Sequence, residues 1–210
     1  GANIGLYSLI ASKILGSSGR VYSYEPSKES YLRFLENIEN NHINNVQAIN
    51  KGLSDSSNAD LVLMQDNDCG DAERYIINHS DGENTLKNDT NEIGMGEKIS
   101  VESLDESLTK FNERKVDFIK IDTEGYEYFV LKGSMNILSQ NPDVIILMEC
   151  TRLGTARAQT TQDAVFNLLE GHDLYPFYWD NKNRCWCNDD EGIMAAGDVW
   201  VCNNINQLIF

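Results

Sequence analysis

A turn bordered by glycines carries the first group of residues suited to binding a ligand. Gly1-Ala2-Asn3-Ile4-Gly5 leads directly into an amphipathic segment, so its backbone N–H groups would lie at the positive end of a helix. Glu25 follows Gly5 by twenty residues, at the end of the next predicted strand, where a carboxylate can accept both hydroxyls of a ribose. This combination indicates a cofactor that carries a nucleoside.

The spacing of the glycines distinguishes between such cofactors. A dinucleotide fingerprint that starts at Gly1 requires glycines at positions 3 and 6, which hold Asn3 and Leu6. A pyrophosphate cradle, and with it a nicotinamide-dependent oxidoreductase, is therefore disfavoured. The four-residue step from Gly1 to Gly5 is the form used around S-adenosylmethionine, whose amino-acid part has no phosphate. A glycine between strand and helix is also often only a cap.

Carboxylates follow two predicted strands in the second half of the chain. Asp122 and Glu124 leave the end of one strand, Glu127 lies in the first turn of the next helix, and Glu149 ends the following strand. Neighbouring carboxylates raise one another's pKa, so one of them could take a hydroxyl proton or hold a metal. Acidic residues also stabilise a helix N-terminus by about 0.3–1 kcal/mol each, so capping explains the pattern equally well. Lys120 is expected to pair with one of these carboxylates.

Cysteine and histidine give weaker signals. The five cysteines are odd in number and irregularly spaced, which favours a reducing compartment and a cytoplasmic location. Cys185 and Cys187 form a C-x-C pair, and a zinc site there would need His172 and Cys202 as further ligands. We favour ordinary thiols on a late hairpin. His79 and His172 are conceivable bases, although a lone histidine in a polar loop is usually only solvated.

These candidate residues all fall at the ends of predicted strands. Strands over 21–24, 46–50, 116–121 and 144–148 alternate with helices, and strands over 174–179 and 198–201 close the chain. The alternation predicts an α/β fold with a Rossmann-like, doubly wound, mostly parallel sheet and an antiparallel C-terminal hairpin. Ligands bind such sheets beyond the carboxyl ends of the strands, where the sequence places Gly1–Gly5, Glu25-Pro26, Gly52–Asp55, Asp122–Gly125 and Glu149–Thr151.

An acidic insertion separates the predicted strands. Residues 60–97 hold ten acidic and two basic residues, a net charge of −8, which is half the −16 of the chain. We expect a loop-rich segment that could contain a hairpin and that acts either as a solvated face or as a lid. The 210 residues are predicted to form a single domain, with a cofactor-binding part over 1–150 and a C-terminal part over 151–210.

Composition excludes several classes of protein. Apolar residues make up 41% of the chain, which argues against disorder. No apolar stretch approaches the ~20 residues that a membrane span requires. A charge of −16 without a basic cluster makes nucleic acid and anionic membranes poor partners. A neutral or cationic ligand is therefore expected.

Taken together, these motifs resemble those of the FkbM-type methyltransferases, which are class I S-adenosylmethionine-dependent enzymes that mostly methylate hydroxyls of sugars and polyketide-type natural products. The resemblance covers roughly residues 1–150. The matching stretches are GANIGLYSLIAS at 1–12, GRVYSYEPS at 19–27, LEN and NNV within 35–46, GLSD at 52–55, ISVESLDE at 99–106, KIDTEGYEYFVLKGS at 120–134 and DVIILMEC at 143–150.

The resemblance implies a role for each group of residues. The residues expected around the methionine part of the cofactor are Gly1, Ala2, Asn3 and Gly5. Glu25, followed by Pro26, would bind the ribose, Ser54 and Asp55 would lie near the adenine, and the segment with Asp122 would form the transfer site. Family members usually have an acidic residue on a first strand, two residues ahead of the first glycine, so that strand is expected to be truncated here.

Two functions from different classes follow. The first is an O-methyltransferase that acts on a small-molecule or glycan acceptor, in which Asp122 or Glu124 assists deprotonation and Glu149 either binds the acceptor or merely caps. A divalent metal is possible, but no metal ligand is assigned. The second is a catalytically inactive, methyltransferase-like binding or scaffold module, with the insertion at 60–97 as its docking surface. Labelled methyl transfer separates the two.

Overall fold

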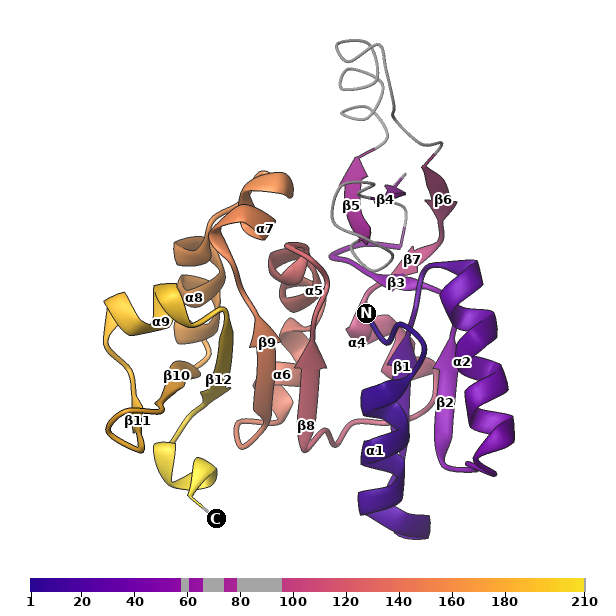
Figure 1. Cartoon of the computed structure of the whole chain (residues 1–210), viewed down its shortest axis with the longest axis horizontal. Coiled ribbons are helices and arrows are strands. Elements are labelled where there is room, and N and C mark those ends of the chain that lie inside the picture. Colours follow the sequence, from indigo (N-terminus) through magenta and orange to yellow (C-terminus); the bar gives the residue numbers. More distant parts are fainter. Residues whose placement is uncertain (58–60, 66–73, 79–95, 210) are drawn as a thin grey trace.

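The computed structural model describes residues 1–57, 61–65, 74–78 and 96–209. Much of the predicted acidic insertion, including His79 and Cys69, therefore lies outside the described residues. Figure 1 shows the arrangement of the elements. The helices are α1 (Leu6–Leu15), α2 (Lys28–Asn40), α4 (Leu104–Lys110), α5 (Glu127–Lys132), α6 (Met135–Gln140), α7 (Arg152–Arg157), α8 (Gln162–Glu170) and α9 (Asp190–Ala196), with 3₁₀ turns η1 (Gly16–Ser18) and η2 (Ile205–Leu208).

The strands form both parallel and antiparallel sheets. Their bounds are β1 (Val21–Tyr24), β2 (Val46–Ile49), β3 (Gly52–Leu53), β4 (Leu61–Gln65), β5 (Arg74–Asn78), β6 (Glu97–Ile99), β7 (Val101–Glu102), β8 (Phe118–Ile121), β9 (Ile145–Glu149), β10 (Tyr175–Asp180), β11 (Cys185–Cys187) and β12 (Asp198–Cys202). The pairs β1–β2, β3–β7 and β8–β9 are parallel. The remaining pairs are antiparallel, so the α/β class is confirmed.

The described strands lie in four sheets rather than one. The largest has the order β11-β10-β12-β9-β8, β4 pairs with β5 and β6, and β1–β2 and β3–β7 form separate pairs. The continuous doubly wound sheet therefore stays a prediction. The expected antiparallel pairing near the C-terminus is confirmed between β10 and β12, but the two are not a simple hairpin, because β11 and α9 lie between them in sequence.

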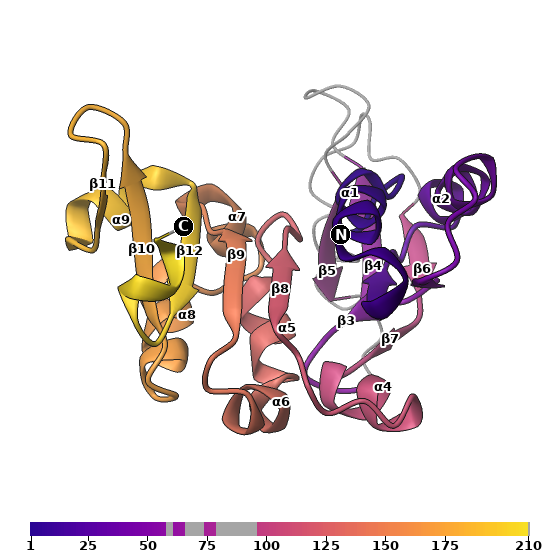
Figure 2. The ribbon, with the colours of Figure 1, turned by 90° about the horizontal axis from the view of Figure 1, so that it is seen from below.

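The main core covers the five-stranded sheet. Figure 2 shows α5, α6 and α8 along one face of this sheet. Ile146 and Met148 of β9 are fully buried against side chains such as Leu131 of α5 and Val165 of α8. The apolar run at 144–148 thus forms an interior strand, as its composition predicts.

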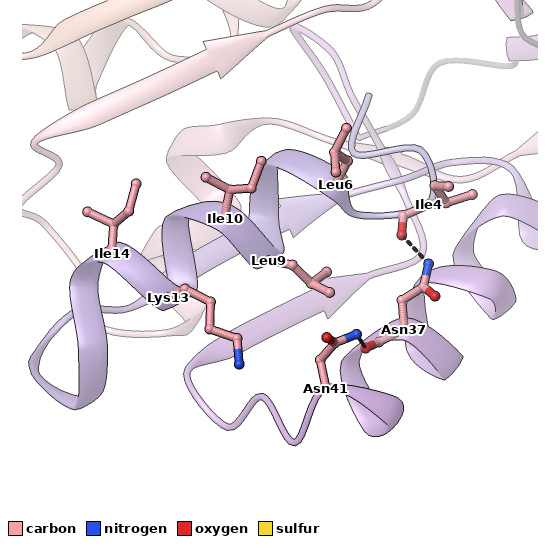
Figure 3. A pocket seen from close by; sticks show the side chains of 8 residues that line it. All are labelled: Ile4, Leu6, Leu9, Ile10, Lys13, Ile14, Asn37 and Asn41. Carbon is pink, nitrogen blue, oxygen red and sulfur yellow. Dashed lines mark hydrogen bonds between the residues drawn. The ribbon is translucent and has the colours of Figure 1, made fainter.

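Helix α1 packs with its polar side inward. Its buried residues are Ser8 and Ser12, and Ser8 Oγ lies 2.8 Å from Ser23 Oγ on β1. The apolar residues at helical spacing face outward, with Leu6 63% and Ile14 79% exposed. They line a shallow groove between α1 and α2 (Figure 3), whose residues are Ile4, Leu6, Leu9, Ile10, Lys13, Ile14, Asn37 and Asn41.

The helix expected between Gly125 and Pro142 is broken into α5 and α6. The break lies at Gly133 and Ser134. A Cβ at Gly133 would lie 2.0 Å from the carbonyl oxygen of Ser54, so the approach of this distant backbone segment interrupts the helix. No helix within the described ranges is both long and apolar enough to cross a membrane.

A buried carboxylate joins β7 to its neighbours. Glu102 accepts hydrogen bonds from Lys51 Nζ at 2.8 Å, Lys110 Nζ at 2.6 Å and Ser107 Oγ at 2.8 Å. Tyr24 at the end of β1 donates to Ser107 at 2.8 Å. Burial alone would raise the pKa of Glu102, but the three donors outweigh it and lower the pKa to about 2. This network ties β1 to α4.

Candidate active site

The glycine turn folds tightly between the ends of β1 and β8. Asn3 and Gly5 have positive φ angles of 50° and 89°, and Ala2 N–H donates to the Tyr24 carbonyl at 2.9 Å. A Cβ at Gly1 would lie 2.9 Å from the Asp122 carbonyl oxygen, and a Cβ at Gly5 would lie 2.0 Å from the Phe34 ring. Gly5 is thus required for packing on α2 as well as for the shape of the turn.

Glu25 meets this turn directly, as its predicted position at the end of β1 requires. The side chain is only 6% exposed. Its Oε2 accepts from Asn3 N–H at 2.7 Å and its Oε1 accepts from Ser27 N–H at 2.9 Å. Each carboxylate oxygen has a second lone pair, so the group can accept two more hydrogen bonds from a ligand that enters between the turn and Ser27.

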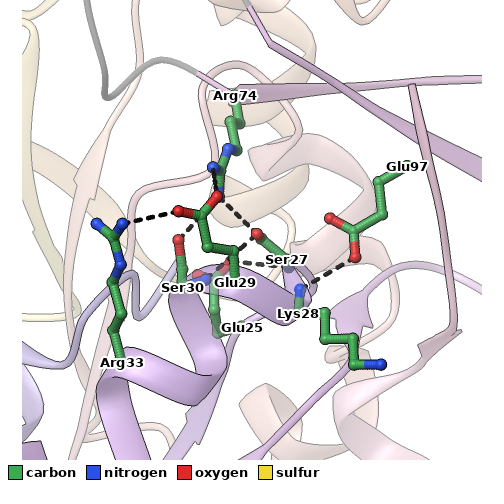
Figure 4. A network of polar contacts seen from close by, with 8 residues as sticks. All are labelled: Glu25, Ser27, Lys28, Glu29, Ser30, Arg33, Arg74 and Glu97. Carbon is green, nitrogen blue, oxygen red and sulfur yellow. Dashed lines mark hydrogen bonds and ion pairs between the residues drawn. The ribbon is translucent and has the colours of Figure 1, made fainter. Parts of the chain in front are cut away.

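The insertion is anchored beside Glu25 by a residue that sequence reasoning missed. Arg74 of β5 donates to Ser27 Oγ at 2.5 Å and to Ser30 Oγ at 2.9 Å, and it pairs with Glu29 at 3.0 Å (Figure 4). Lys28 N–H donates to Glu97 Oε1 of β6 at 3.1 Å. The one available signal was that Arg74 is one of only two basic residues in the acidic insertion.

Asp122, Glu124 and Glu149 converge at the carboxyl ends of β8 and β9. One carboxylate oxygen from each lies within 4.8 Å of the others, and all three side chains are half-buried. Glu124 sits in the left-handed region with φ 53°. The expected pairing of Lys120 is confirmed, since its Nζ lies 2.6 Å from Asp122 Oδ2. Lys120 also lies 4.4 Å from the centre of the Tyr7 ring on α1.

The surroundings of Glu149 raise its affinity for a proton. Burial first, and then repulsion by Glu124, Asp122 and Asp198, raise the pKa of Glu149 to about 7. A carboxyl group with this pKa can both take and release a proton near neutral pH.

Glu127 does not share the position of the other three carboxylates. It is 1% exposed. Its Oε1 accepts from Thr123 N–H at 3.1 Å, Thr123 Oγ1 at 2.8 Å and Gly125 N–H at 3.1 Å. Glu127 therefore stabilises the loop that presents Glu124. Glu127 thus bonds to the loop, whereas Glu149 lies with Asp122 and Glu124. A catalytic role for these three carboxylates stays a prediction.

The residues expected near the adenine face α5. Ser54 is fully buried, and its Oγ lies 3.1 Å from the Tyr126 hydroxyl. Asp55 pairs with Lys132 Nζ at 2.8 Å. Pro26 lies beside the turn, and its carbonyl accepts from Asn50 Nδ2 at 3.1 Å. Contact of Ser54, Asp55 and Pro26 with a cofactor stays a prediction.

The residues considered as zinc ligands do not lie close together. Cys202 is buried and donates to the Asn204 carbonyl at 3.3 Å, whereas His172 Nδ1 lies 3.2 Å from Ser139 Oγ. Within the part of the chain that the structure describes, the single group of three or more side chains placed to share a cation is Asp122, Glu124 and Glu149.

Comparison with known proteins identifies a family. The family model described as the methyltransferase FkbM domain matches residues 1–174, which is most of the 210-residue chain. Searches of the curated proteins and of the solved structures found no match.

Proposed function

Because the chain belongs to the FkbM methyltransferase family, we propose that it transfers a methyl group from S-adenosylmethionine to a hydroxyl oxygen of a small-molecule or glycan acceptor. The observation that carries the proposal is the convergence of Asp122, Glu124 and Glu149. A Cβ at Gly1 would meet the Asp122 carbonyl oxygen at 2.9 Å, so the backbone of the cluster lies against the first residue of the glycine turn.

The residues around the turn fit a nucleoside-bearing cofactor. Glu25 already holds Asn3 N–H at 2.7 Å and keeps lone pairs for the two ribose hydroxyls. Gly1, Ala2, Asn3 and Gly5 would border the methionine part. When bound, S-adenosylmethionine supplies an electrophilic methyl group on a sulfonium centre. The protein's task is then to position the acceptor oxygen and to remove its proton.

Glu149 is the proposed proton acceptor. Its pKa of about 7 leaves a substantial ionised fraction at neutral pH and makes it a stronger base than an ordinary carboxylate. Asp122 is held by Lys120 at 2.6 Å, so it is fixed in place to orient the acceptor. Alignment of two bound reactants supplies a further part of the rate.

The charge of the cluster restricts the acceptor. Three carboxylates and one lysine give a site that repels phosphate and carboxylate groups. A neutral polyhydroxyl compound such as a sugar fits this site, and its hydroxyls can donate hydrogen bonds to the carboxylate oxygens.

The test combines cofactor binding with turnover. Calorimetry with S-adenosylhomocysteine is expected to show binding that Glu25→Ala weakens. Transfer of labelled methyl groups to a panel of glycans and hydroxylated small molecules is expected to be lost in Glu149→Gln, while S-adenosylhomocysteine binding is retained. Glu170→Gln, at an exposed residue ending α8, is the matched control.

Two results would count against the proposal. Absence of S-adenosylhomocysteine binding would overturn it entirely. Binding without transfer to any acceptor, or full transfer in Glu149→Gln, would overturn the catalytic part and favour a methyltransferase-like binding module.

A further inference from the structure

Two thiols lie side by side on the outer strand of the five-stranded sheet, away from the cluster at β8 and β9. Cys185 and Cys187 belong to β11, and their Sγ atoms are 3.6 Å apart. Among the described strands β11 pairs only with β10, which places it at the edge of the five-stranded sheet (Figure 1). Because side chains alternate along a strand, residues two apart point to the same face.

Trp186 holds the strand in this orientation. Its ring lies 5.3 Å from the Trp179 ring and 6.0 Å from the Trp200 ring, between centroids. Its Nε1 donates to the Leu208 carbonyl at 3.0 Å. With Trp186 packed on one face of β11, the two cysteines are displayed together on the other.

This pair is open to reagents in solution. Cys185 is exposed and Cys187 is half-buried. The other two cysteines of the described residues, Cys150 and Cys202, are both 0% exposed. Among these four cysteines a dissolved oxidant therefore reaches Cys185 first, with a second thiol already within 3.6 Å.

We propose that Cys185 and Cys187 form a redox-active dithiol, which a small disulfide such as oxidised glutathione converts into an intramolecular disulfide. The Cys185 thiolate attacks one sulfur of oxidised glutathione, and one glutathione leaves. The Cys187 thiolate then attacks Cys185 Sγ and displaces the second glutathione. The protein loses two electrons and two protons, and one oxidised glutathione becomes two reduced molecules.

The strand geometry makes this disulfide easy to reduce. Residues two apart in a strand have Cα atoms separated by about 6.7 Å, at the upper end of the range of about 4.4–6.8 Å found for disulfides. Bond formation must therefore bend β11, and strained, exposed disulfides are the labile ones. Only three residues of β11 pair with β10, so the edge strand offers little resistance to bending.

The bend would act on the start of α9. Cys187 lies opposite Tyr178 in the register, and the Tyr178 hydroxyl donates to Asp189 Oδ2 at 2.6 Å. Asp189 caps α9 by accepting from Gly192 N–H at 2.9 Å. A Cβ at Gly192 would lie 2.1 Å from the Tyr178 ring, so a displaced Tyr178 presses directly on this helix.

The experiment uses the full chain, reduced, freed of reductant and then exposed to oxidised glutathione. Intact mass after alkylation is expected to show loss of two hydrogen masses and two fewer alkylated cysteines. Peptide mapping should place the bond between Cys185 and Cys187, and dithiothreitol should reverse it. In Cys187→Ser the reaction is expected to stop at a glutathione adduct on Cys185. A parallel Cys69→Ser background removes the cysteine outside the described residues.

Two results with these proteins would contradict the proposed disulfide. A persistent glutathione adduct on Cys185 in the unsubstituted chain, equal to that in Cys187→Ser, would show that Cys187 does not resolve it. A disulfide between two chains, seen on a non-reducing gel, would likewise overturn the proposal. Circular dichroism melts of each variant establish that it is folded. Amide exchange of α9 is expected to quicken on oxidation and to be unchanged by glutathione in Cys185→Ser.

Discussion

Methyl transfer should depend on pH near neutrality because of Glu149. With a pKa of about 7, Glu149 is ionised in about 10% of molecules at pH 6 and about 90% at pH 8. If the ionised form accepts the proton of the acceptor hydroxyl, the single-turnover rate with saturating cofactor rises about tenfold between these pH values. A carboxylate with an ordinary pKa is fully ionised across this range and would give a flat profile.

Removal of the charge of Glu124 should shift the pH dependence of the methyl-transfer rate to lower pH. Repulsion by Glu124 is the largest charge effect that raises the pKa of Glu149, after burial. Glu124→Gln is therefore expected to lower the pKa of Glu149 part of the way toward its ordinary value. The rate at pH 6 then increases relative to the rate at pH 8, and the rise shifts to lower pH. Glu170→Gln, on an exposed site, should leave the profile unchanged.

The pKa of Glu149 can also be measured directly, without an acceptor substrate. Glutamate labelled with ¹³C at the side-chain carboxyl reports each titration by NMR, and Glu149→Gln identifies the resonance of Glu149. A Glu149 resonance that titrates near pH 4.5, or one that does not respond to Glu124→Gln, would refute the reasoning. A flat rate profile with a titration near pH 7 would instead show that Glu149 is not the base.

Three further predictions concern stability. Gly5→Ala places a Cβ 2.0 Å from the Phe34 ring at a φ of 89° and is expected to cost about 3 kcal/mol or more in urea unfolding. Gly16→Ala strains the backbone at φ 61° and ψ −155°, but its Cβ would meet no neighbouring group of the described residues within 4 Å, so its cost is the backbone strain alone, about 1–3 kcal/mol. A loss at Gly16 as large as that at Gly5 would contradict the packing argument. Glu102→Gln is expected to lower the free energy of unfolding by about 2–4 kcal/mol at pH 7. Because the native pKa of Glu102 is lowered to about 2, this loss should shrink as pH falls from about 4.5 toward 2. A loss of stability that does not change with pH would exclude the ionic network as its cause. The pKa of Glu149 is raised to about 7, so between about pH 4.5 and 7 the native state binds a proton that the unfolded state has lost, and the stability of the native state falls as pH rises through this range. Glu149→Gln should therefore raise the midpoint of thermal unfolding at pH 8 but not at pH 4. An equal effect at both pH values would argue against the raised pKa.

Local sequence signals predicted those elements whose causes are local. Ser27 is of a residue type that favours the N-cap position, and its side chain accepts from Ser30 N–H at the start of α2. Glu25 was placed at the end of β1 by the apolar run before it, and its contact with the glycine turn followed from the shared edge of the strands. The same reasoning placed Glu149 at the end of β9, although not its raised pKa, which depends on the distances to other carboxylates.

Features decided by distant contacts could not be predicted. The break between α5 and α6 depends on the approach of the Ser54 backbone to Gly133, which no local pattern reports. Glu127 and Glu124 are both acidic residues of the same segment, yet Glu127 accepts three hydrogen bonds from Thr123 and Gly125 of the loop. The role of Arg74 required knowledge of where β5 lies.

The separation of β1–β2 from β8–β9 affects how the molecule opens. Strands joined by backbone hydrogen bonds protect one another's amides from exchange, and neighbouring sheets without such bonds can open as separate cooperative units. Within the described residues the two parallel pairs share no ladder. The glycine turn contacts both, because Ala2 N–H donates to the Tyr24 carbonyl of β1 at 2.9 Å and the Gly1 nitrogen donates to the Asp122 carbonyl after β8 at 2.7 Å. A ligand seated on that turn would bind both units at once. It should therefore slow amide exchange in both pairs together, so that two weakly coupled units become one.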